Sequence, residues 1–246
     1  MTNLIETSAF SFPKSEGRKN QDSILSPRKL EDGYLLAVAD GVGSYTGGGT
    51  ASQIAIEHLR TTITKSQLLD VELLLSDIKG KIIDFSETDN TYAQAATTLT
   101  FAFINHEGLR VTHIGDCRVY LKEDNHLIQL TRDHTQFQRF VDDKVFTKKY
   151  LEGTKAKSIL TTAIAANIEM KADSFFIPIE SLPKENKTVT LYIMSDGAHC
   201  FWDKRPRFSE RTMNSMSQFS NNFKRRIEKL SPVDDYSLVG IVVELA

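Results

Sequence analysis

The stretch VADGVGSYTGGGTAS, residues 38–52, leads an apolar run into an Asp-Gly pair and then into a loop with five glycines. A dinucleotide-binding fingerprint needs G-x-G-x-x-G, but position 46, three residues after Gly43, is Thr. A P-loop needs Gly-Lys-Ser/Thr, and no lysine occurs in this stretch. A phospho-accepting D-x-D motif needs Asp at position 38, where Val stands. The stretch therefore predicts an Asp-Gly corner after a strand and a flexible loop that leads into a helix.

Acidic residues recur at the ends of other apolar runs. Asp116 follows VTHIG, Asp196 follows LYIMS, and the pair Asp234–Asp235 opens the last apolar run. A single aspartate at a strand end is an ordinary cap or turn former, but several at one sheet edge would repel each other and raise their own pKa values. A divalent cation removes that conflict, and oxygen ligands without His or Cys favour Mg²⁺ or Mn²⁺. Two such ions about 4 Å apart would acidify a bridging water for attack on phosphorus.

The apolar patterns place strands and helices around these acids. Strands are expected at residues 34–40, 98–104, 110–116, 117–123, 188–196 and 236–245. Helices are expected along the apolar stripes from Ala51 to Ile63, from Val71 to Phe85 after an Asp70 cap, and from Met216 to Leu230. The order is not a strict strand–helix alternation, which favours mostly antiparallel sheets with helices outside them. No linker divides the 246 residues, so we expect one domain over 1–246.

Composition excludes several classes of protein. Thirty basic and thirty-two acidic side chains give a net charge of −2, which argues against nucleic acid as a partner. No apolar run approaches the roughly 18 residues of a membrane span, and the first twenty residues lack a secretory signal core. Two cysteines, Cys117 and Cys200, are too few for a disulfide framework. We expect a protein of the cytoplasm that does not bind membranes.

Seven segments, taken together, resemble the metal-dependent type 2C protein phosphatases in order and approximate spacing. They are NQDSIL (20–25), VADGVGSYTGGGTAS (38–52), AATTLTFAFI (95–104), VTHIGDCRVYL (111–121), LTRDHT (130–135), LYIMSDG (191–197) and DDYSLVGIVV (234–243). The resemblance implies an α+β fold, a four-layer α/β/β/α sandwich with two central, mostly antiparallel sheets. It also implies hydrolysis of phosphoserine and phosphothreonine in proteins by a metal-bridging water. A phosphorylated protein is then the substrate, and a Ser/Thr kinase the partner enzyme.

The resemblance also assigns metal ligands residue by residue. Asp40 is similar to the carboxylate that bridges two Mg²⁺ or Mn²⁺ ions, and Gly41 to the residue whose carbonyl binds one of them. Asp196 and Asp234 are similar to the remaining ligands of the other ion. Asp116 is similar to the ligand of a weaker third ion.

Other residues are expected to support the ligands or the substrate. Asp22 resembles the acid that holds metal-bound waters, and Gln21 stands where many members have Glu. Asp235 falls where Asn is common, so we expect a supporting role. Arg18 is the nearest candidate to hold the substrate phosphate, although it lies one place closer to NQD than expected. The alternative interpretation is that Arg18 is an ordinary solvated arginine of the surface.

Two departures from the family pattern keep other functions open. Val42 stands where some members carry a His that protonates the leaving group, and the SDGxWD pattern is stretched so that its second acid falls at Asp203. One alternative is a pseudophosphatase that acts as a binding or regulatory module. Another is a phosphatase of small phosphate esters.

Overall fold

The computed structural model describes residues 2–43, 46–62 and 64–245. Ser44 and Tyr45 of the glycine loop lie outside the described residues, as do Ile63 of the first expected helix and the two terminal residues of the expected domain.

Two five-stranded sheets form the centre of the fold, and each described strand pair in them is antiparallel. The first sheet has the order β1 (Thr2–Phe12), β12 (Tyr236–Leu245), β11 (Thr188–Met194), β7 (Arg118–Glu123) and β8 (His126–Gln129). The second has the order β10 (Asp173–Pro178), β6 (Gly108–Ile114), β5 (Leu99–Asn105), β3 (Gly33–Asp40) and β2 (Asp22–Leu30). A short pair, β4 (Ala96–Thr97) and β9 (Ile164–Ala165), lies beside them.

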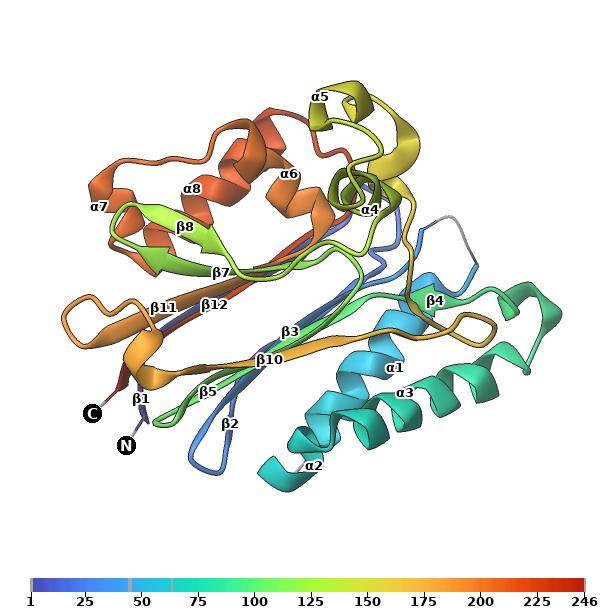
Figure 1. Ribbon diagram of the computed structural model, residues 1–246, viewed down its shortest axis with the longest axis horizontal. Coiled ribbons are helices and arrows are strands. Elements are labelled where there is room, and N and C mark those ends of the chain that lie inside the picture. Colours follow the sequence, from blue (N-terminus) through green and yellow to red (C-terminus); the bar gives the residue numbers. More distant parts are fainter. Residues whose placement is uncertain (1, 44–45, 63, 246) are drawn as a thin grey trace.

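Helices cover both outer faces of the sandwich (Figure 1). On the side of the second sheet lie α1 (Gly48–Thr61), α2 (Lys65–Leu69) and α3 (Val71–Ser86). On the side of the first sheet lie α6 (Asp196–Lys204), α7 (Glu210–Met213) and α8 (Met216–Lys229). The short helices α4 (Gln136–Asp142) and α5 (Lys148–Leu151) lie at one end of the sheets. Single 3₁₀ turns occur at Asn90–Tyr92, Lys155–Ser158 and Ile179–Ser181. The expected α/β/β/α sandwich is confirmed.

Three apolar layers hold these elements together. Side chains alternate along β5, so Phe101 and Phe103 pack toward α1–α3 while Ala102 and Ile104 pack toward the other sheet. The third layer joins the first sheet to α6 and α8. Burial on both sides explains why β12 reads as apolar at nearly every position.

Two strands end two residues before the aspartate that was expected to close them, β6 at Ile114 and β11 at Met194. β11 ends at Met194, so Asp196 opens α6 and does not close a strand. An acid in a first helical turn interacts favourably with the positive end of the helix dipole. Residues 136–165 contain the short helices α4 and α5, which the polar pattern did not indicate. Asp70 caps α3 as expected, accepting a 3.2 Å hydrogen bond from the Leu73 N–H. No helix in the described ranges has the length and apolar character of a membrane span.

Candidate metal-dependent active site

Strand pairing brings the first two acids together. Asp22, the first residue of β2, is the register partner of Asp40, the last residue of β3. The Asp40 N–H donates to Thr98 Oγ1 at 3.0 Å, and the Asp40 carbonyl accepts from the Thr98 N–H at 2.8 Å and from Thr97 Oγ1 at 3.0 Å. The threonines of the AATTL segment therefore fix the backbone at the Asp-Gly corner.

Gly41 allows α1 to begin directly against this corner. A Cβ at position 41 would lie 2.4 Å from the Gly48 carbonyl carbon and 2.8 Å from the Gln21 carbonyl oxygen. Any larger residue would push the start of α1 away from β3. The glycine-rich loop thus serves close backbone packing.

Asp196 and Asp234 meet through a second close contact. A Cβ at Gly197 would lie 2.0 Å from the Asp235 carbonyl oxygen and 3.1 Å from the Asp234 carbonyl carbon. The start of α6 therefore touches the segment that leads into β12. This contact brings two acids 38 positions apart in the sequence to the same edge of the sandwich.

Asp116 lies in the turn between β6 and β7. Gly115 has a φ of +108°, a conformation that favours glycine, and a Cβ there would lie 2.4 Å from Thr98 Cγ2. His199 of α6 is buried, and its Nε2 donates a 3.0 Å hydrogen bond to the Asp116 carbonyl. This bond ties α6 to the turn that carries Asp116.

The acids open into a cavity of about 330 Å³. Its lining includes the aspartates at 40, 116, 196 and 234 together with Arg18 and Lys14. A larger neighbouring cavity of about 770 Å³ shares Asp116, Asp196 and Asp234, and its lining also includes residues of α4 and α5. Among the described residues, Arg18 and Lys14 form no ion pair. Two unpaired cations therefore line the same cavity as the four carboxylates.

Burial and repulsion between carboxylates raise the pKa values of Asp40, Asp116 and Asp196. The pKa of Asp40 is raised well above its usual range by burial and by the charges of Asp22, Asp196 and Asp116. Burial also raises the pKa of Asp116, with a further contribution from Asp196. The pKa of Asp196 rises to about 6 through burial and the charge of Asp234. The group is electrostatically unfavourable without a positive charge at its centre.

Asp22 lies behind the cavity. Burial raises its pKa to about 7, although its Oδ2 accepts hydrogen bonds from Ser195 Oγ at 2.8 Å and Ser237 Oγ at 2.7 Å. Its Oδ1 is buried and has no hydrogen-bond partner among the described residues. A buried carboxylate oxygen without a partner is costly, and a metal-bound water would supply the missing donor.

Asp235 and Gln21 support the loop that carries Arg18. Asp235 Oδ1 accepts from the Lys14 N–H at 2.7 Å, and its Oδ2 accepts from the Gln21 N–H at 2.8 Å. Both carboxylate oxygens are therefore used on backbone groups. The Oε1 of Gln21 is buried without a partner in the described part of the chain, and it would lie 3.1 Å from a Cβ at Gly43.

The donor set fits a hard divalent cation. The cavity carboxylates include Asp40, Asp116 and Asp196 with raised pKa values, and hard oxygen ligands suit Mg²⁺ and Mn²⁺. In the described ranges, only Asp32, His106 and Glu107 form a trio whose ligand atoms all lie within 4.8 Å of one another. Lys65 already pairs with Asp32 and Glu107, so that trio carries its own cation.

Three features of the site depend on contacts between distant parts of the chain. Lys14 enters the cavity only because its backbone is bound by Asp235, 221 positions away. His199 contacts the site through a backbone carbonyl, which no motif shows. Asp203, the second acid of the stretched SDGxWD pattern, has a side chain that is 53% exposed. It forms an ion pair of 2.9 Å with Arg118 of β7.

Comparisons with known proteins identify the family of the chain. The family model described as protein phosphatase 2C matches residues 14–239. The serine/threonine phosphatase stp of Listeria welshimeri is 26% identical over 171 residues, which are 66% of this chain and 66% of that protein. The serine/threonine protein phosphatase PstP of Mycobacterium tuberculosis is 30% identical over 152 residues, 60% of this chain and 29% of that protein. The chain thus covers just under two thirds of stp and a smaller share of PstP.

Solved structures show the same fold. Serine/threonine phosphatase Stp1 from Staphylococcus aureus has a TM-score of 0.82 and 17% identity, covering 97% of this chain and 95% of that chain. The catalytic domain of PstP in complex with two manganese ions has a TM-score of 0.74 and 22% identity, covering 99% of both chains. The family model spans nearly the whole chain and includes the acids that line the cavity. The chain belongs to the protein phosphatase 2C family.

Proposed function

We propose that the chain is a metal-dependent phosphatase that hydrolyses phosphoserine and phosphothreonine in proteins, and that residues 1–246 form one catalytic domain. The observation that carries this proposal is the cavity in which four aspartates face Arg18 and Lys14. The substrate class rests on family membership and on the related proteins named as serine/threonine phosphatases.

The carboxylates have distinct roles in this proposal. Asp40 and the Gly41 carbonyl would hold one Mg²⁺ or Mn²⁺ ion, Asp40 with Asp196 and Asp234 would hold a second, and Asp116 would hold a weaker third. The raised pKa values of Asp40, Asp116 and Asp196 support cation binding at this cavity, because a nearby cation would stabilise each ionised carboxylate. When bound, the ions acidify water and neutralise charge at the phosphate.

The remaining residues orient the substrate and the ligands. Arg18 binds the phosphate at the rim of the cavity, and Lys14 adds a second positive charge there. Asp235 holds the segment that carries both, because it accepts hydrogen bonds from the Lys14 and Gln21 backbone N–H groups on either side of Arg18. Asp22 and Gln21 lie behind the ligands and each has one buried oxygen available for water.

We also propose that the reaction takes place in the cytoplasm. Cys117 and Cys200 are free thiols, which fits the reducing cytoplasm. A Ser/Thr kinase that modifies the same proteins is the natural counterpart, since a phosphatase needs a source of phosphoprotein.

The test is phosphate release from a phosphothreonine peptide with Mn²⁺, with Mg²⁺ and with EDTA. Asp196→Asn is the test variant, and Asp77→Asn, an exposed aspartate of α3, is the matched control. The proposal expects metal-dependent release that Asp196→Asn loses by at least about 100-fold and Asp77→Asn retains.

Two outcomes would overturn it. No release from folded protein under any condition would favour a binding module. Hydrolysis of p-nitrophenyl phosphate without hydrolysis of any phosphopeptide would favour a phosphatase of small esters.

A further inference from the structure

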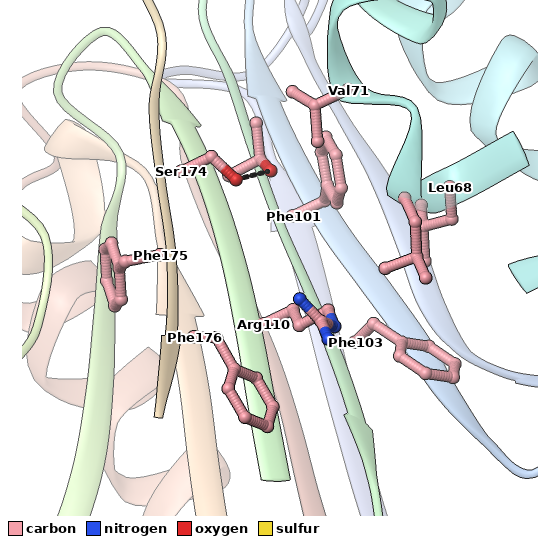
Figure 2. A pocket seen from close by; sticks show the side chains of 10 residues that line it. Leu68, Val71, Phe101, Phe103, Arg110, Ser174, Phe175 and Phe176 are labelled. Atoms are coloured by element: carbon pink, nitrogen blue, oxygen red, sulfur yellow. Dashed lines mark hydrogen bonds between the residues drawn. The ribbon is translucent and has the colours of Figure 1, made fainter. Parts of the chain in front are cut away.

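A separate cavity of about 220 Å³ lies on the outer face of the second sheet, away from the aspartates. Its walls come from the sheet strands β5, β6 and β10 and from the junction of α2 and α3 (Figure 2). The helix α1 packs over β2 and β3, and β10 is the edge strand at the far side of the sheet. The cavity therefore occupies the part of the sheet face beside the helices.

The strand register builds this cavity from two rows of side chains. In the first row Arg110 of β6 is flanked by its register partners Phe103 and Phe176. In the second row Thr112 is flanked by Phe101 and Ser174. Residues directly opposite one another on antiparallel strands share a face, so both rows line the same hollow.

Figure 2 shows how these side chains lie. The Arg110 guanidinium is at the centre, between the rings of Phe103 and Phe176, while Leu68 and Val71 close the helix side. Phe175 points away from this group, and it packs in the layer between the sheets.

The Arg110 guanidinium lies against the Phe176 ring and, among the described residues, has no carboxylate partner. Its guanidinium carbon lies 4.4 Å from the centroid of the Phe176 ring, a cation–π contact. Within the described ranges no carboxylate pairs with it. Asp70, which lies between two lining residues in the chain, instead caps α3 through the Leu73 N–H.

The hydroxyls of Thr112 and Ser174 form a polar spot in the second row. They lie 3.2 Å apart and hydrogen-bond to each other. The rest of the lining is aromatic or aliphatic, apart from the Arg110 guanidinium. Ligand sites commonly combine an apolar wall with a few such polar groups that fix orientation.

We propose that this cavity binds a small aryl or branched-alkyl carboxylate. The carboxylate pairs with the Arg110 guanidinium, whose planar fork matches two carboxylate oxygens. The apolar part of the ligand lies against Phe103, Phe176 and Leu68. The cavity volume suits a molecule of one ring and a short acid arm.

The test uses phenylacetate as probe and nuclear magnetic resonance titration in EDTA, so that no phosphatase activity is needed. Phenylacetamide is the neutral match, and it should bind at least about 10-fold more weakly because it lacks the charge. Arg110→Gln should weaken phenylacetate binding by a similar factor. Arg211→Gln, an exposed arginine of α7, should leave it unchanged.

Two further variants keep the result interpretable. Phe176→Ala should weaken binding while the protein stays folded, because this ring is 38% exposed on an edge strand. Arg18→Ala should leave binding unchanged, which separates this cavity from the cavity of the aspartates.

Several results would overturn the proposal. They are the absence of saturable phenylacetate binding in the millimolar range, equal binding of phenylacetamide, equal binding by Arg110→Gln, or loss of binding in Arg18→Ala. None of them bears on phosphate release, so this proposal and the proposed function fail or stand separately.

Discussion

The Ser195 hydroxyl donates a 2.8 Å hydrogen bond to Oδ2 of Asp22, which lies 173 positions earlier in the chain. Ser237 Oγ donates a second bond of 2.7 Å to the same oxygen, and the Ser237 N–H donates to Ser195 Oγ at 2.9 Å. Ser195 precedes α6 but makes no side-chain cap for that helix. Its hydroxyl is instead committed to orienting a buried acid behind the candidate metal ligands.

Ser195→Ala should raise the Mn²⁺ concentration for half-maximal activity by about 10-fold, because groups that orient the surroundings of a metal strongly affect its affinity. At saturating Mn²⁺ the rate should change far less. Phosphate release measured across a Mn²⁺ series checks this, with Ser26→Ala, an exposed serine of β2, as control. An unchanged Mn²⁺ requirement would show that Asp22 does not act on the metals.

Arg18→Ala and Lys14→Met should each raise KM by about 10-fold with a smaller effect on kcat, since both cations line the cavity and, in the proposed function, bind the ground-state phosphate. Arg18→Lys should recover only part of the loss, because lysine lacks the two-pronged geometry. Steady-state kinetics on a phosphopeptide provide the measurement, and Lys19→Met controls for loop charge. An unaltered KM in Arg18→Ala would identify Arg18 as a surface residue.

Arg118 pairs with two acids, and we expect them to contribute unequally to the free energy of unfolding. Its guanidinium forms two hydrogen bonds to Asp133, of 2.8 and 2.7 Å, and one to the exposed Asp203 of 2.9 Å. Asp133→Ala should lower the free energy of unfolding by about 3 kcal/mol, because it leaves the Arg118 charge buried and only partly paired. Asp203→Ala should cost less than about 1 kcal/mol.

Urea unfolding of both variants checks the order of these effects. Asp203→Ala should also keep near-normal phosphatase activity, because Asp203 serves Arg118. A loss of activity comparable to that of Asp196→Asn would instead make Asp203 a metal ligand.

His113 should make the protein less stable in mild acid. Its Nε2–H donates to the Arg132 carbonyl at 3.1 Å, so its Nδ1 accepts from the Thr100 hydroxyl at 2.8 Å, and burial lowers its pKa from 6.5 to about 4. Between these values the unfolded chain binds a proton that the folded chain does not, so the free energy of unfolding falls as pH falls. The loss attributable to His113 is about 3 kcal/mol.

Unfolding curves of the natural protein and of His113→Gln, measured from pH 7.5 to pH 4, check this. The variant should be less stable at pH 7.5, because its hydrogen bonds fit less well, but its stability should decline less with acid. The difference between the two curves isolates His113 from the other titrating groups. Parallel curves would contradict the assignment.

Many strands and helices could be predicted from the sequence, because elements buried on one face carry apolar residues at a regular spacing. The alternation along TLTFAFI predicts β5 with Phe101 and Phe103 on one face, and the three-and-four spacing after Asp70 predicts α3. Short or exposed strands such as β8 and β10 gave no such pattern, because few of their side chains are buried. The end of β11 was misjudged by two residues, since a helix that begins directly after a strand leaves no turn residues between them.

Sequence alone determined that aspartates stand at the ends of Asp-Gly and Gly-Asp corners, because those corners are local and chemically distinctive. Tertiary structure decided what each acid does. Asp234 and Asp235 are neighbours in the chain, yet Asp234 lines the cavity, whereas both carboxylate oxygens of Asp235 accept hydrogen bonds from the backbone N–H groups of Lys14 and Gln21. Those partners lie more than 200 positions away, at 221 and 214. A side chain's role depends on which groups fold against it, and no local pattern records contacts at that separation.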